Sequence, residues 1–226
     1  WRYTETILGI LNCLTAEQQL QLLCAQDSDG NTALHHAAWW GHTETVKSVL
    51  DNLTPEQLLK FILVRDNGGN TALHKATQQG HTETMKTLLD NLTHEKQLNL
   101  LYTRNHYGNT ALHDAARKGH TETLRTLLDN LIPEQQLQLL FIPDIGGNTA
   151  LHYAAQQGHT GAVKSLLDIL TPEQQLKLLS VRNIKVMTAS EEAAGYHETL
   201  DTMRTLEQYQ NEADYRVNYR KFAIFT

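Results

Sequence analysis

The segment G-N-T-A-L-H-H-A-A-W-W-G-H, residues 30–42, sets the fold of this 226-residue chain. It returns with small changes at residues 69–81, 108–120 and 147–159, so consecutive copies lie 39 residues apart. A repeat of fixed length predicts a stacked array in which each repeat packs on its neighbours, because such a chain has no single central core.

The period also divides the rest of the chain. Glu5-Thr6 lies 39 residues before Glu44-Thr45, so the first residues match the second half of a repeat. The predicted divisions are a partial repeat at 1–26, full repeats at 27–65, 66–104, 105–143 and 144–182, a degenerate capping repeat at 183–209, and a capping helix or tail at 210–226. Because the chain begins within a repeat, we expect it to be a segment of a longer protein.

Each repeat carries the signals of three short helices. Thr32 is placed to cap a helix over residues 33–40, which Gly41 then ends. Thr43 is placed to cap a second helix that runs to about residue 53. Thr54-Pro55-Glu56-Gln57 supplies a cap, a proline at the first helical position and a glutamine that completes a capping box, so a third helix should follow. The predicted fold class is an all-α repeat solenoid of stacked helix-turn-helix repeats, with an extra short helix per repeat and finger-like loops.

The constant residues of the first helix predict how the repeats pack. One leucine per repeat should contribute to an apolar rib formed by Leu34, Leu73, Leu112 and Leu151. Eight of the 12 histidines belong to the repeated T-A-L-H and G-H pairs. We expect these histidines to bond to neighbouring backbone groups.

The fifth repeat departs from the pattern. Ser190 and Glu191 replace the Leu and His of T-A-L-H, and polar residues on an outer face suit a terminal cap. Residues 195–200 should restore the start of a second helix. Beyond it, Tyr215, Tyr219 and Phe222 recur at helical spacing, which favours a helix laid over the last repeat. The alternative is a docking segment for a following domain.

Composition argues against several classes of function. The net charge is −6 and the pI about 6.0, so no basic surface for nucleic acid is evident. No apolar run reaches membrane-spanning length, and no signal peptide is present. Cys13 and Cys24 lack the spacing of a metal or redox motif, which fits a reducing compartment. We therefore expect no nucleic-acid partner, no membrane association and a cytoplasmic location.

The segment T-A-L-H-H-A-A-W-W-G-H-T-E-T-V-K-S-V-L, residues 32–50, resembles the ankyrin repeat, with Ala33 where that family usually has proline. Ankyrin repeats are typically about 33 residues long, and the extra residues here fit where the T-P-E-Q-Q-L segment lies. Long repeats of this kind resemble ankyrin arrays of intracellular bacteria, which are often delivered into the host cytoplasm. The resemblance implies an L-shaped stack with projecting fingers and a concave face that binds a partner protein without catalysis.

Some positions vary between repeats while the scaffold stays constant, and the resemblance places them on the concave face. They are the predicted partner-binding residues: Asp29, His36, Trp39, Trp40, Lys75, Gln78, Gln79, Tyr107, Asp114, Arg117, Lys118, Tyr153, Gln156 and Gln157. Ordinary surface variation explains the glutamines well. It explains Trp39-Trp40 poorly, because adjacent exposed indoles are unusual on a surface that binds nothing.

The sequence offers no set of residues that predicts catalysis, metal binding or a cofactor. His36 and His106 have no cysteine or carboxylate at metal-ligand spacing. The G-G-N turns lack the lysine or the G-x-G-x-x-G spacing of phosphate-binding loops. We expect no catalytic residue, no metal and no cofactor.

Three hypotheses follow. The leading one is a binding module for another protein, with Trp39 and Trp40 as apolar anchors and Lys75, Asp114, Arg117 and Lys118 setting the electrostatic register. The second is a substrate-recruiting accessory domain of a larger enzyme or bacterial effector, whose catalytic part lies outside this chain. The third is packing against another domain of the chain's own parent protein.

Overall fold

The structure, a computed structural model, describes residues 2–195 and 199–224, and side chains at 5–6, 8–195 and 199–218. This part of the chain is all-helical, which confirms the predicted fold class. It divides into two compact units, Trp1–Ala111 and Leu112–Thr226.

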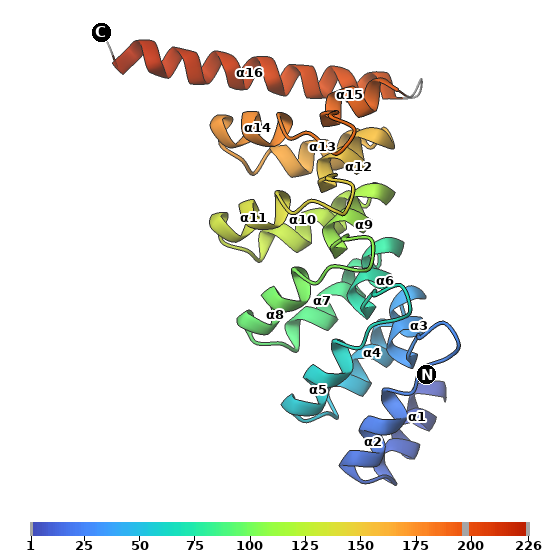
Figure 1. The fold of residues 1–226 in the computed structure, drawn as a ribbon. Coiled ribbons are helices and arrows are strands. Elements are labelled where there is room, and N and C mark those ends of the chain that lie inside the picture. Colours follow the sequence, from blue (N-terminus) through green and yellow to red (C-terminus); the bar gives the residue numbers. More distant parts are fainter. Residues whose placement is uncertain (1, 196–198, 225–226) are drawn as a thin grey trace. The chain divides into compact units, whose positions relative to one another are not determined.

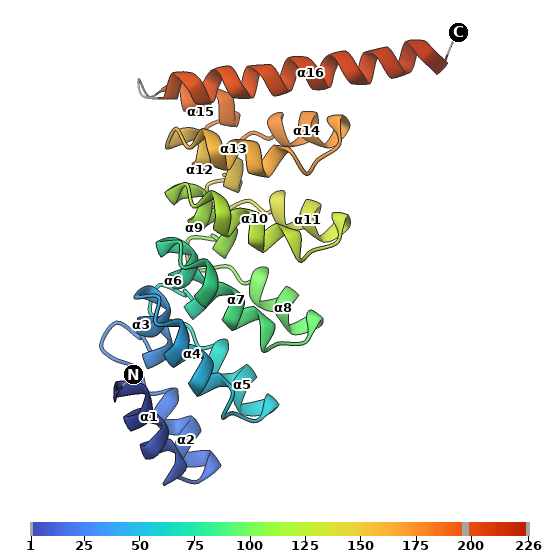
Figure 2. The ribbon, with the colours of Figure 1, turned by 180° about the vertical axis from the view of Figure 1, so that it is seen from behind.

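The N-terminal unit holds one partial repeat and two complete helix triplets. Its helices are α1 (Arg2–Asn12), α2 (Ala16–Leu23), α3 (Ala33–Trp39), α4 (Thr43–Leu50), α5 (Pro55–Ile62), α6 (Ala72–Gln79), α7 (Thr82–Asp90) and α8 (His94–Leu101). The first helices α3 and α6 lie side by side, and α4 packs on α7 (Figure 1). Seen from behind, the third helices α5 and α8 lie at the edge opposite α3 and α6 (Figure 2).

Local sequence explains the third helix. The Gln57 amide donates to Thr54 Oγ1 at 3.3 Å, and the Thr54 amide donates to Gln57 Oε1 at 3.0 Å, so the predicted capping box is confirmed. Gly80 ends α6 with φ 72°, a left-handed conformation that a side chain would disfavour.

The second helix differs from its prediction. Thr43 is its first residue and His42 its N-cap, without a side-chain bond, and the helix stops at Leu50. The tight Gly-His turn brings the chain directly into the helix, so the Thr43 hydroxyl is not used as a cap. It lies 2.6 Å from the Thr84 hydroxyl of the next repeat instead.

The predicted leucine rib is buried in both units. Leu34 and Leu73 are 3% and 0% exposed in the N-terminal unit, and Leu112 and Leu151 are 0% and 1% exposed in the C-terminal unit. Alanines beside them, such as Ala76 at 0% exposed, leave room for the neighbouring first helix. No short helix buries this apolar face alone, so stacking stabilises each repeat.

The C-terminal unit has the same plan and a longer final helix. Its helices are α9 (Ala111–Lys118), α10 (Thr121–Asp129), α11 (Pro133–Leu140), α12 (Ala150–Gln156), α13 (Thr160–Leu167), α14 (Pro172–Leu179), α15 (Ala189–Ala194) and α16 (Leu200–Ile224). Helix α16 packs on α13, α14 and α15 (Figure 1). It runs without a break through the predicted division between residues 209 and 210.

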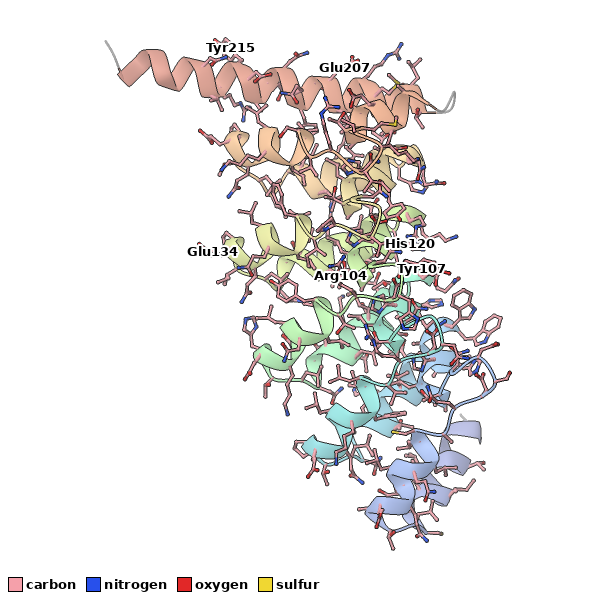
Figure 3. All side chains as sticks on the ribbon, in the orientation of Figure 1. Arg104, Tyr107, His120, Glu134, Glu207 and Tyr215 are labelled. Carbon is pink, nitrogen blue, oxygen red and sulfur yellow. The ribbon has the colours of Figure 1, made fainter. Side chains whose placement is uncertain are left out.

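Helix α16 lies over the last repeat as predicted, but its packing face does not include Tyr215. Leu206 and Ala213 are 1% and 0% exposed, whereas Tyr215 is 70% exposed. Two residues turn a helix by about 200°, so Tyr215 lies opposite Ala213. Glu207 and Tyr215 point away from α14 (Figure 3). The side chains of Tyr219 and Phe222, and residues 196–198 of the predicted second-helix start, lie outside the described residues.

Candidate functional site

The first helix of each repeat is positioned by the histidine of T-A-L-H. In the N-terminal unit the Thr71 amide donates to His74 Nδ1 at 3.2 Å, so the neutral ring carries its proton on Nε2. His74 Nε2 donates that proton to the Asn109 carbonyl at 3.1 Å. Burial lowers the pKa of His74 to about 4, which keeps this ring neutral at pH 7.

The same bridge occurs elsewhere in both units. His35 Nε2 donates to the Asn70 carbonyl at 3.0 Å, and His152 Nε2 to the Met187 carbonyl at 3.2 Å. Burial also lowers the pKa of His113 to about 4, and its Nε2 donates to the Asn148 carbonyl at 3.2 Å. The prediction that T-A-L-H histidines bond to neighbouring backbone is confirmed.

The histidine of the G-H pair fixes the end of the preceding first helix. His81 Nε2 donates to the Trp39 carbonyl at 3.0 Å. A Cβ atom at Gly41 would lie 2.6 Å from His81 Nδ1, so only glycine lets the ring approach. In the C-terminal unit His159 Nε2 donates to the Arg117 carbonyl at 3.1 Å. Scaffold residues thus hold the helix ends where the variable residues begin.

The two tryptophans of α3 have different surroundings. Trp40 is 66% exposed, whereas Trp39 is half-buried. The Lys75 ammonium lies 5.9 Å from the centroid of the Trp39 ring, within reach of a cation–π interaction. The next variable pair, Gln78 and Gln79, is half-buried. Trp40 is therefore the large apolar group that the N-terminal unit presents at these helix-one positions.

Lys75 is held by its own repeat. Its Nζ lies 2.6 Å from Asp66 Oδ2, and its side chain is 17% exposed. Burial by itself would raise the pKa of Asp66, but hydrogen bonds from Lys75 and Asn70 outweigh it and lower that pKa to about 2. The positive charge of Lys75, which was predicted to set the electrostatic register with a partner, is neutralised within its own repeat.

The other predicted residues of the N-terminal unit are exposed on the finger loops or on α3. Asp29 is exposed, and Tyr107 is 64% exposed on the finger that follows α8 (Figure 3). His36 is exposed as well, with Nε2 at 2.8 Å from Asp27 Oδ2. Adjacent fingers are joined through their backbones, because the His106 amide donates to the Gly68 carbonyl at 2.9 Å.

In the C-terminal unit the predicted charges are partly inside. Asp114 is 4% exposed, and its carboxylate lies 3.5 Å from the Arg117 guanidinium. Arg117 also lies over the Tyr153 ring, 4.2 Å from its centroid. Lys118 and Gln157 are exposed, whereas Gln156 is half-buried. Asp114 therefore offers no accessible charge, because it sits on the inward side of α9.

Two fingers of the C-terminal unit carry an apolar stretch whose residues are not among the predicted partner-binding residues. Ile145 and Ile184 are 70% and 76% exposed, and the Ile184 amide donates to the Gly146 carbonyl at 2.9 Å. Val186 is 65% exposed with φ 63°, a left-handed conformation that is costly for a β-branched residue. The sequence signal for this stretch is the presence of apolar residues within segments that form exposed turns.

Other kinds of site were sought in the described part of the chain. No group of three or more His, Cys, Asp or Glu side chains there is arranged to hold a metal ion. Among the described helices, none combines the length and the apolarity needed to cross a membrane.

Comparison with protein families gives matches over most of the chain. A model of three ankyrin repeats matches residues 54–138 and 101–177. A model of many ankyrin repeats matches residues 15–49. A search of curated proteins returned no similar sequence.

Proposed function

Because this chain belongs to the ankyrin repeat family, we propose that it is a non-catalytic module that binds a partner protein on the concave face of its array. Ankyrin repeats generally act as protein–protein interaction modules and are typically non-catalytic. The contacts would come from the exposed ends of the first helices and from the finger loops.

One observation carries the proposal: Trp40 is 66% exposed at the end of a helix whose scaffold residues are repeated elsewhere without an aromatic residue at that position. The equivalent residues are Gln79, Lys118 and Gln157. The scaffold therefore does not require an indole there. Tryptophan is enriched among the residues that dominate binding energy at protein interfaces, so its exposure favours a contact role.

The rigidity of the fingers supports the same function. The Asn67 amide donates to the Asp29 carbonyl at 3.0 Å, and the next finger makes the equivalent bond from His106 to Gly68. Fingers held in this way lose little conformational entropy when a partner binds. Preorganisation of this kind raises affinity without new contacts.

The test compares two exposed apolar residues. The wild-type protein, Trp40→Ala and Leu22→Ala are used as bait in affinity capture from a cell lysate, and retained proteins are identified by mass spectrometry. Leu22 is a matched control because it is 50% exposed on α2. We expect one partner to be retained by the wild type and by Leu22→Ala and lost from Trp40→Ala, while circular dichroism shows all three proteins folded. Equal retention by Trp40→Ala and the wild type would remove Trp40 from the binding site.

A second variant tests whether the fingers take part. Tyr107→Ala removes an exposed ring from a finger of the same unit. We expect weaker retention of the partner that Trp40→Ala loses, measured by titration of the captured protein. Retention unchanged in Tyr107→Ala would restrict the contact to the helix ends.

A further inference from the structure

The first residue of each finger is an aspartate or an asparagine with one fixed task. Asp66 Oδ1 accepts the amides of Gly68 and Asn70, at 2.9 and 2.7 Å. In the C-terminal unit, Asp144 Oδ1 accepts the amides of Gly146 and Asn148, at 2.8 and 2.7 Å. This oxygen closes the turn, and either aspartate or asparagine supplies it.

The other side-chain atom faces the first helix, at the residue nine positions later. Asp27 Oδ2 lies 2.8 Å from His36 Nε2, and Asp66 Oδ2 lies 2.6 Å from Lys75 Nζ. Tyr153 donates its hydroxyl to Asp144 Oδ2 at 2.5 Å. In the last finger, Asn183 Nδ2 donates to Glu192 Oε1 at 2.7 Å. In each case this contact joins the finger to the middle of the helix.

The chemistry of the two positions changes together. Where the finger has aspartate, the helix supplies a donor, and the three donors are an imidazole, an ammonium and a phenol. Where the finger has the amide of Asn183, the helix supplies the acceptor Glu192, which is 5% exposed. Independent variation at the two positions does not explain why donor and acceptor exchange places on both sides of the contact at once.

We propose that His36, Lys75, Tyr153 and Glu192 are positioning residues that lock each finger to its first helix, and are not contact residues for the partner. The consequence for binding rests on the proposed function, because the finger tips are its contact surface. Locking sets where Asp29 and its counterparts project, and it leaves contact with the partner to these finger residues and to the residues at the helix ends.

The experiment replaces the aspartate–lysine pair of one finger by the asparagine–glutamate pair of the last finger. Lys75→Glu places two carboxylates together at the finger of the N-terminal unit. The double variant Asp66→Asn, Lys75→Glu reproduces the Asn183–Glu192 chemistry. Hydrogen exchange of the Gly68 and Asn70 amides is followed by NMR. We expect Lys75→Glu to accelerate both amides about tenfold or more, the scale of losing a hydrogen bond to a charged group. The double variant should return them close to the wild-type rates.

Tyr153→Phe provides a milder variant with the same logic, because it removes one hydroxyl and keeps the ring. It should accelerate the Gly146 and Asn148 amides and leave the Gly68 and Asn70 amides unchanged. This variant gives the answer if Lys75→Glu accelerates all amides together through global unfolding. The proposal is overturned if finger exchange is unaffected by Tyr153→Phe, or if the double variant exchanges as fast as Lys75→Glu. Neither readout needs a partner, so failure here is separate from failure of the proposed function.

Discussion

The finger and first helix at residues 66–79 in the N-terminal unit, and those at 183–194 in the C-terminal unit, share backbone hydrogen bonds but differ in side chains. The Asp66 amide donates to the Asn70 carbonyl at 2.9 Å, and the Asn183 amide to the Met187 carbonyl at 3.0 Å. Each helix then starts with a threonine in a capping box. Yet Gly69, Leu73 and His74 become Val186, Ser190 and Glu191.

The difference separates two kinds of constraint. The turn and the cap need only atoms in the right place, so both segments form them. Gly69 and His74 are constrained by the next finger instead. A Cβ atom at Gly69 would lie 2.8 Å from the backbone nitrogen of His106, and His74 donates to the Asn109 carbonyl. Val186 and Glu191 are exposed, and neither constraint acts on them. Much of the repeat motif therefore describes the contact between repeats, not the repeat itself.

The largest predicted effect comes from placing the glutamate of the last repeat at the buried position of an inner repeat. His74→Glu keeps an acceptor for the Thr71 amide but sets a carboxylate against the Asn109 carbonyl at a site that is 0% exposed. An uncompensated buried charge costs about 3–5 kcal/mol, and we expect urea denaturation to show a loss of that size in the free energy of unfolding. Glu191→His, at the exposed counterpart, should cost much less. Equal losses would mean that the two segments are not constrained differently.

An effect that is smaller for each histidine and each pH unit should follow from acid. His74 and His113 have pKa values near 4 in the folded protein against 6.5 for the unperturbed group. The unfolded chain therefore binds protons below pH 6.5 that the folded protein does not. Stability is complete above pH 6.5 and falls as the pH drops toward 4, by at most about 1.4 kcal/mol per pH unit for each histidine.

The two segments should respond to acid differently. Hydrogen bonds from Thr188 lower the pKa of Glu191 below 4.5. Glu191 therefore stays charged over the pH range in which the neutral histidines stop stabilising the folded protein. Between pH 6.5 and 4.5 the amides of α6 should gain exchange rate from local opening, after correction for the intrinsic pH dependence, and those of α15 should not. A parallel rise in both helices would show that α15 depends on the same histidines.

The fold was predictable because its signals are local and occur in several copies. The capping box at Thr54 and the left-handed glycine at Gly80 depend on a few adjacent residues. The histidine bridges were predictable because they recur. The cap of the second helix was predicted wrongly, since the Thr43 hydroxyl bonds to Thr84 in another repeat, and no local pattern reports that distance.

The candidate site was predictable only in part. Trp40 and Tyr107 vary between repeats and are exposed, but variation alone does not distinguish an exposed side chain from one that is paired within its repeat. Lys75 and Tyr153 each pair with a finger aspartate, Asp66 or Asp144, at a spacing of nine residues that belongs to no helix or strand period. The paired change from aspartate to asparagine was the signal in the sequence. The same signal applies to Asp114, because asparagine Asn105 stands nine residues before it.

The smallest predicted effect comes from giving the last finger the glycine that the other fingers have. Val186 has φ 63° where the other fingers have glycine, such as Gly69 with φ 77°. A left-handed conformation costs a residue with a Cβ about 1–2 kcal/mol, so Val186→Gly should raise the free energy of unfolding by an amount of that order or less, because glycine also adds entropy to the unfolded chain. Ile184→Gly is the matched control, since Ile184 is also largely exposed and has no positive φ, and it should lower stability. If Val186→Gly also lowers stability in urea denaturation, contacts of the valine side chain outweigh the backbone strain at this position. The last finger would then be constrained by packing, as the other fingers are.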